Sequence, residues 1–117
     1  MPRLYVKRAY EPAVPADGMR ILVDRLWPRG VTKAAAHIDQ WAKDAAPSTA
    51  LRQWFHEDPD RRFAAFSKKY TAELKGNPTA ADLRKTVRAT TGAVTLVTAA
   101  KEPERSHVPA LRTYLRK

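Results

Sequence analysis

Three stretches of the chain carry the hydrophobic patterns of β-strands. Residues 4–10 (LYVKRAY) alternate apolar and polar side chains and include β-branched and aromatic residues. Residues 20–27 (RILVDRLW) contain three successive apolar residues, which predicts a strand that is buried on both faces. Residues 93–100 (AVTLVTAA) are β-branched and apolar without a charge, and they give the clearest strand signal in the sequence.

Helical spacing occupies most of the remaining chain. Apolar residues recur on one face in four stretches, at residues 48–56, 58–76, 79–91 and 106–117. Ser48 and Ser106 are suitable N-caps for the first and the last of them. Thr79 and Asp82 have the spacing of a capping box at the start of the third. A proline at position 59 is suited to the first turn of the second helix.

The order of these elements predicts the fold class. Strand, strand, helices, strand, helix is typical of an α/β domain in which helices flank a small and mostly parallel sheet in Rossmann-like layers. The length of 117 residues suits a single domain over 1–117. Two points stay open: residues 38–46 fit either a helix or an extended segment, and the proline-rich loop at 11–18 leaves the direction of the first strand undetermined.

Composition and charge narrow the function classes. The absence of cysteine excludes disulfides, thiolate nucleophiles and cysteine-based zinc sites. No apolar run is long enough to span a membrane and no secretory signal is visible, so we expect a soluble, cytoplasmic protein that does not bind membranes. The net charge of +10 attracts phosphates, nucleic acid or acidic lipid, yet the cations are scattered and form no basic tail.

Two basic segments stand at the ends of predicted strands. The segment DRLWPRG (24–30) leaves the core after the second strand, and KEPERSH (101–107) follows the third. If these strands are parallel neighbours, both segments lie at the carboxyl edge of the sheet, where open α/β sheets bind ligands. Pro28 and Gly30 end the strand pairing and turn the chain.

These segments predict an anion site. Arg25, Arg29 and Lys101 supply positive charges, and the amides that follow Ser106 at a helix N-terminus add a partial charge. Such a site prefers a phosphate or a carboxylate. The helix dipole lowers the pKa of His107, which suits a general base.

Further residues are candidates for the same pocket. Asp24 is the acid whose position at a strand end recommends it for catalysis, His56 is a second candidate for proton transfer, and Trp27 is the tryptophan best placed to line a pocket. Structural roles compete with these functions: Arg25 equally fits an ion pair with a nearby carboxylate, and Arg29 fits an ordinary loop charge.

Several chemistries lack their motifs. The glycines at 18, 30, 76 and 92 stand alone, so the sequence contains no glycine-rich phosphate loop. Three histidines without cysteines show no metal-ligand spacing, and no nucleophile elbow surrounds a serine. We therefore expect neither a metal nor a cofactor, and the sequence leaves open whether the protein is an enzyme.

The segments LVDRLWPRG, APSTALRQWFHEDPDRRFAAFSKKYTAEL and VTLVTAAKEPERSHVPALRTYL resemble the YeaO-like branch of the bacterial domain of unknown function 488 (DUF488) family. The resemblance covers nearly the whole chain and implies an α/β domain of unestablished activity. The family pattern falls on thirteen positions of this chain: Arg8, Asp24, Arg25, Trp27, Pro28, Arg29, Gly30, Trp54, Phe55, His56, Pro59, Lys101 and His107.

This chain departs from the family pattern at two points. The residue before the histidine is often asparagine in this branch, whereas Ser106 stands here; both residues cap helices, so the structural role survives. Longer members of the wider family place a cysteine beside the histidine, and its absence here argues against a thiol-dependent reaction.

The sequence thus supports three functional hypotheses, the third being an interaction module whose helices contact another protein. The first is a basic pocket for a small molecule that bears a phosphate or a carboxylate, with Arg8, Arg25, Trp27, Arg29, Lys101 and Ser106 as ligand-binding residues and His107, His56 and Asp24 as catalytic residues if a reaction occurs. The second is a nucleic-acid-binding protein that uses its overall positive charge. The oligomeric state is not predicted.

Overall fold

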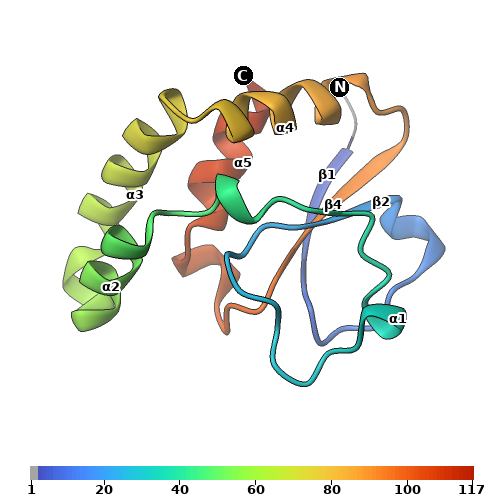
Figure 1. Ribbon diagram of the computed structural model, residues 1–117, viewed down its shortest axis with the longest axis horizontal. Coiled ribbons are helices and arrows are strands. Elements are labelled where there is room, and N and C mark those ends of the chain that lie inside the picture. The colour runs from blue at the N-terminus through green and yellow to red at the C-terminus, as the bar shows by residue number, and fades with distance from the viewer. Residues whose placement is uncertain (1–2) are drawn as a thin grey trace.

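All the strands that the computed structural model describes, within residues 3–117, run parallel in one sheet (Figure 1). The strands are β1 (Arg3–Arg8), β2 (Met19–Leu22), β3 (Gln40–Trp41) and β4 (Ala93–Thr98), in the spatial order β1-β4-β2-β3. The predicted α/β class with a mostly parallel sheet is therefore confirmed. The direction of the first strand, which the sequence left open, is also resolved. β1 pairs with β4 in parallel, and β4 is parallel to β2, so the first two strands run in the same direction although they are not neighbours.

Most of the helical structure lies between β3 and β4 or after β4. The helices are α1 (Lys33–Ala36), α2 (Thr49–Glu57), α3 (Pro59–Lys75), α4 (Pro78–Ala89) and α5 (Val108–Arg116). Short 3₁₀ turns occupy Pro15–Asp17, Lys43–Ala45 and Pro103–Arg105. Residues 38–46, which the sequence left ambiguous, contain β3 and one of these turns.

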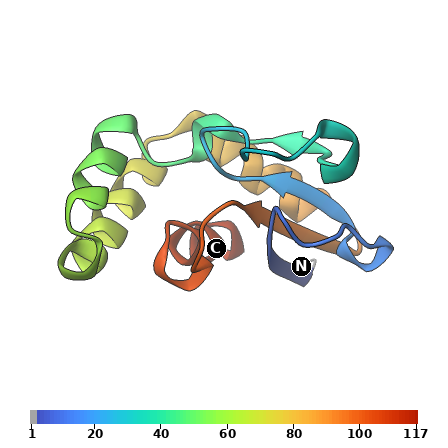
Figure 2. The ribbon, with the colours of Figure 1, turned by 90° about the horizontal axis from the view of Figure 1, so that it is seen from below.

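The main core lies between the helices and one face of the sheet. Ile21 of β2 and Leu96 of β4 are fully buried there, together with residues from three of the long helices such as Tyr70, Leu83 and Leu111. The hydroxyl of Tyr70 donates a hydrogen bond of 2.6 Å to the carbonyl of Ala45, which ties α3 to the segment after β3. In Figure 2 the long helices α2 to α5 lie toward one side of the strands.

The other face of the sheet is covered by the segment between β2 and β3. Leu22 and Val97 are fully buried on this face, against the partly buried Trp27, Val31 and Ile38. Burial of the second strand on both faces is thus confirmed. On this second face the cover is an irregular segment with the one-turn helix α1, whereas the sequence suggested helices.

The second predicted strand is shorter than the pattern at 20–27 suggested. Strand pairing ends at Leu22, and one further backbone bond joins Val23 to Val97. The carboxylate of Asp24 then accepts hydrogen bonds from β4 and its exit, so a side chain replaces the backbone ladder. The tail of the predicted strand, including Trp27, therefore belongs to a loop.

The start of α4 also differs from the prediction. The N-cap is Asn77, whose side-chain oxygen accepts from the amides of Thr79 and Ala80, and Pro78 fills the first helical position. The predicted capping box at Thr79 and Asp82 is wrong by two residues. Proline at the first turn has no amide to satisfy, which makes Asn77 the better cap.

A buried polar cluster joins β1, β2 and α1 on the loop-covered face. Asp17 forms ion pairs with Arg20 at 2.7 Å and with Lys7 at 3.1 Å, and Arg20 also donates to the carbonyl of Ala36. Burial opposes ionisation of Asp17, but hydrogen bonds from the Val14 amide and from the two cations outweigh it and hold its pKa below the ordinary value. The cluster therefore stays charged and connects three elements.

The tight approach of Gly18 to β4 yields a test of this topology. A Cβ atom at Gly18, where φ is +65°, would lie 2.1 Å from the carbonyl oxygen of Ala93. We expect Gly18→Ala to lower the free energy of unfolding by about 3 kcal/mol or more, through backbone strain and the clash. Urea denaturation followed by circular dichroism measures the change.

Gly92→Ala is the matched control. Its φ is +85°, but no atom lies within 4 Å of the added Cβ, so only the backbone strain of about 1–2 kcal/mol is expected. Equal destabilisation by the two substitutions would contradict the close packing of Gly18 on β4.

Candidate functional site

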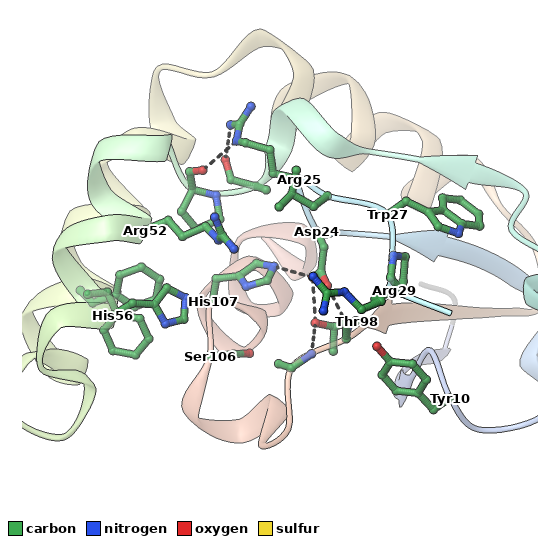
Figure 3. Close-up of a pocket in the computed structure, with 18 residues that line it drawn as sticks. Tyr10, Asp24, Arg25, Trp27, Arg29, Arg52, His56, Thr98, Ser106 and His107 are labelled. Atoms are coloured by element: carbon green, nitrogen blue, oxygen red, sulfur yellow. Dashed lines mark hydrogen bonds and ion pairs between the residues drawn. The ribbon is translucent and has the colours of Figure 1, made fainter. Parts of the chain in front are cut away.

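A pocket of about 370 Å³ opens at the carboxyl edge of the sheet (Figure 3). Its walls come from the exits of β2 and β4, from α2 and from the start of α5. Seven of the sequence-predicted site residues line it: Asp24, Arg25, Trp27, Arg29, His56, Ser106 and His107. The parallel pairing of β2 and β4, the condition on which the sequence-based site depended, brings the two basic segments to this edge.

Asp24 links the two strand exits at the centre of the pocket. Its carboxylate accepts a 2.8 Å hydrogen bond from the hydroxyl of Thr98 and a 2.7 Å hydrogen bond from the amide of Ala99. The carbonyl of Asp24 accepts from the indole of Trp41 at 2.8 Å. Asp24 therefore holds β2, β4 and β3 together where the chain leaves the sheet.

His107 lies beside Asp24 and lines the pocket. Its Nε2 atom is 2.9 Å from the carbonyl oxygen of Val23 and 3.5 Å from a carboxylate oxygen of Asp24. Because a carbonyl oxygen only accepts, the neutral ring carries its hydrogen on Nε2 and leaves Nδ1 as the acceptor. Burial lowers the pKa of His107, and the nearby Asp24 charge and Val23 carbonyl oppose that shift only in part.

The guanidinium of Arg25 makes its contacts within the protein. It donates to the carbonyls of Pro47 at 3.2 Å and Ala46 at 3.3 Å, and lies 3.7 Å from the carboxylate of Asp44. The last contact involves an exposed carboxylate and contributes little to stability. Arg25 thus lines the pocket while its donors fasten the segment before α2.

Trp27 and Ser106 occupy fixed positions in the pocket wall. The indole of Trp27 donates to the carbonyl of Val31 at 2.6 Å and packs edge-on against Trp41, with 5.5 Å between ring centroids. The hydroxyl of Ser106 donates to the carbonyl of Pro103 and accepts from the amide of Val108. The N-cap of α5 is His107, so the prediction of Ser106 as the N-cap is wrong by one residue. The Ser106 hydroxyl still accepts from the first amide of the helix, and one amide of the predicted anion cradle is therefore already occupied.

Two arginines and a histidine at the pocket have no carboxylate partner. Arg29, Arg52 and His56 are exposed and line the pocket, and within residues 3–117 none of them forms an ion pair. Figure 3 shows Arg52 and His56 on the α2 side of the pocket. Arg52 was not among the sequence candidates. Its spacing of four residues from His56 on a helix was the available signal.

Two predicted ligand-binding residues lie outside this pocket. Arg8 donates to the carbonyl of Ala100 at 2.9 Å and covers the ring of Tyr10, so it fastens the end of β1 to the exit of β4. Lys101 is exposed and does not line the pocket. From the sequence, Lys101 was expected to converge with Arg25 at the anion site. Instead the alanines at 99 and 100 line the pocket, and the chain turns away at Lys101.

Aromatic rings from the helices form the apolar wall. Phe55 and Phe66 are buried and stacked, with 4.1 Å between their centroids, and both line the pocket. Tyr10, which the sequence analysis did not select, lines it from the β1 side and is half exposed. The pocket therefore combines an aromatic interior with guanidinium groups that reach solvent.

Two further properties concern the residues that the structure describes. No group of three or more histidine, cysteine, aspartate or glutamate side chains is placed to hold a metal ion in residues 3–117. In the same range, no helix has the length and apolar character that crossing a membrane requires.

Comparison with known proteins identifies relatives along nearly the whole chain. A family model described as the inactive DUF488-N3 subclade matches residues 3–117. The uncharacterized protein Rv3073c of Mycobacterium tuberculosis is 42% identical over 113 residues, which cover 97% of this chain and 93% of that protein. The uncharacterized protein YeaO of Escherichia coli is 40% identical over 114 residues, or 94% of each chain. No solved structure matches.

The largely enclosed His107 makes stability depend on pH. Its pKa in the folded state lies below the ordinary value of 6.5, so the unfolded chain binds more protons as the pH falls below about 6.5. We expect the free energy of unfolding to decrease over that range, by at most about 1.4 kcal/mol per pH unit for this group. In His107→Gln the decrease is expected to be smaller, and urea denaturation between pH 7 and pH 5 measures it. An unchanged slope would contradict a neutral buried imidazole.

The Asp24 contacts provide a second test. Asp24→Asn removes the charge and replaces one acceptor oxygen with an NH₂ group. This NH₂ group is a donor, and it faces either a backbone amide or a hydroxyl that also donates. We expect a loss of about 1–3 kcal/mol in the free energy of unfolding. Asp44→Asn is the control, because this exposed carboxylate forms only the 3.7 Å contact with Arg25 and its loss is expected to cost about 0.5 kcal/mol or less. Similar losses in both variants would contradict a central role for Asp24.

Proposed function

The chain belongs to the DUF488 family, in the subclade described as inactive, and from this membership and the pocket we propose that it is a small-molecule-binding protein. Its ligand carries a phosphate or a carboxylate on an apolar, preferably aromatic, body. The single observation that carries the proposal is the presence of exposed, unpaired Arg29 and Arg52 around a pocket with stacked aromatic walls, within the described part of the chain.

The cationic side chains support the anionic end of the ligand. Guanidinium groups bind phosphate and carboxylate oxygens through paired N–H donors, and these charge-assisted bonds are stronger than neutral ones. Arg52 and His56 stand one helical turn apart on α2, and Arg29 comes from the exit of β2. An anion at the mouth of the pocket would meet donors from two separate elements.

The interior of the pocket supports the apolar end of the ligand. A volume of about 370 Å³ lies in the range of small-molecule sites, which are lined mostly by apolar groups and a few polar ones. Phe55 and Phe66 offer apolar surface on the α2 and α3 side. Burial of a ring against them would contribute affinity that inorganic phosphate alone lacks.

The hydrogen bonding of the central polar groups favours binding of the ligand without its chemical conversion. Both carboxylate oxygens of Asp24 accept hydrogen bonds from the protein, and Nε2 of His107 faces a backbone carbonyl. Groups held in this way position the strand exits and leave Nδ1 of His107 as the remaining base. The description of the subclade as inactive agrees with this proposal. Catalytic roles for His107, His56 and Asp24 stay predictions from the sequence.

Titration with phenyl phosphate, benzoate and inorganic phosphate tests the proposal. Amide NMR of the labelled full chain is expected to show saturable shifts near Gly30, Arg52 and His107, with the aromatic ligands binding more tightly than inorganic phosphate. The double variant Arg29→Gln and Arg52→Gln is expected to bind more weakly. The dissociation constant rises about tenfold or more for each arginine, because each substitution removes a charged hydrogen bond.

Arg61→Gln combined with Lys68→Gln is the matched control. Both residues are exposed on α3, neither lines the pocket, and the pair removes the same amount of charge. Equal weakening by the two double variants would overturn a defined anion site. Release of phosphate from phenyl phosphate by the native chain, abolished in His107→Gln, would overturn binding without conversion and restore an enzymatic function.

A further inference from the structure

The ends of four elements meet at the amino edge of the sheet, opposite the pocket. Arg84 of α4 lies over the ring of Tyr114 of α5, 4.5 Å from its centroid. Arg112 of α5 donates to the carbonyl of Leu4 at the start of β1. Arg3 of β1 pairs with the first residue of β4. In Figure 1 the start of β1 and the end of α5 lie at this edge, near α4.

Positive charge gathers at this edge without matching negative charge. We define the amino-edge face by its cations Arg3, Arg84, Lys85, Arg88, Arg116 and Lys117. Asp82 is the one acidic residue in β1, α4, α5 or the start of β4. None of these cations forms an ion pair within residues 3–117.

Helix capping accounts for only part of this charge. Arg88 and Arg116 stand in the last turns of α4 and α5, where cations interact favourably with the negative end of the helix dipole. Lys85 lies one turn before Arg88 and is also exposed, and Arg3 belongs to a strand. A surplus of exposed cations therefore remains after the dipoles are compensated.

We propose that the amino-edge face is a docking surface for the phosphate backbone of double-stranded nucleic acid. Exposed lysines and arginines bind phosphates irrespective of sequence and release the counterions condensed on the duplex. This surface is separate from the pocket at the carboxyl edge, and the inference stands independently of the small-molecule ligand proposed above.

The surroundings of the face favour a duplex over other polyanions. Within residues 3–117 the exposed large apolar residues are Tyr5, Tyr10, Val14, Leu26 and Trp41. Only Tyr5 of β1 belongs to an element of this face, and none of them comes from α4 or α5. Tyr114 beneath Arg84 is buried. Single strands are held largely by stacking on exposed aromatic rings, and membrane-surface helices insert an apolar face into the lipid. The two basic helices of the amino-edge face present neither feature.

Fluorescence anisotropy with a labelled 20-base-pair DNA duplex tests the inference on the full chain. The dissociation constant is expected to rise steeply between 0.05 and 0.3 M salt. In the triple variant Lys85→Glu, Arg88→Glu and Arg116→Glu, loss of three phosphate contacts is expected to weaken binding by roughly 10²–10³-fold at 0.1 M salt and to lower the salt slope by about 3. Circular dichroism checks that the variant is folded, and the corresponding glutamine triple variant, expected to weaken binding in the same direction, replaces it if it is not.

A second triple variant, Lys33→Glu, Lys43→Glu and Lys68→Glu, is the matched control. These lysines are exposed on α1, a 3₁₀ turn and α3, and both triple variants have the same net charge. Retention of duplex binding by the control supports the amino-edge face. Equal weakening of both variants, absence of duplex binding by the native chain, or binding only to vesicles containing phosphatidylserine would overturn the inference.

Discussion

The carboxylate of Asp24 is the interaction on which the carboxyl edge of the sheet depends. At the end of a parallel sheet the last backbone amides have no partner in the ladder. Here one carboxylate accepts from the amide of Ala99 and also from the hydroxyl of Thr98, both at the exit of the neighbouring strand. The same residue receives the indole of Trp41 on its carbonyl and has His107 beside it. Four elements therefore converge on one residue, and the paths by which they leave Asp24 define the walls of the pocket.

This arrangement explains why polar groups in the pocket divide into two kinds. Asp24, Arg25 and Ser106 lie on the segments that fold the edge, and each is hydrogen-bonded to backbone atoms. Arg29 and Arg52 lie further out, where water still solvates them and no carboxylate competes for their donors. Buried polar groups must be satisfied by the protein, whereas exposed ones remain available for a ligand.

The fold is predictable from the sequence where local pattern and topology agree. The apolar runs around Ile21 and Leu96 predicted buried strands, and parallel strands place their carboxyl ends together whatever the details of the loops. The family resemblance drawn from the sequence is confirmed by a match over residues 3–117. Side-chain partners were harder to predict. From the sequence alone, Arg25 could bind either a ligand or another part of the protein. Only the folded position of Ala46 and Pro47 shows that their carbonyls accept its hydrogen bonds. The spacing of Arg52 from His56 indicates a shared helix face, but the position of α2 beside the pocket is a long-range contact that no local pattern encodes.

The unequal cover of the sheet has a consequence for motion. One face is sealed by four helices and the large core, while the other is closed by an irregular segment that packs on Leu22 and Val97 through three partly buried side chains. Opening that segment exposes less apolar surface than loss of the helix-side core, so we expect its local unfolding to require less free energy than global unfolding. Because the exit of β2 begins both this segment and one wall of the pocket, we expect partial opening to widen the pocket while the helix-side core remains folded.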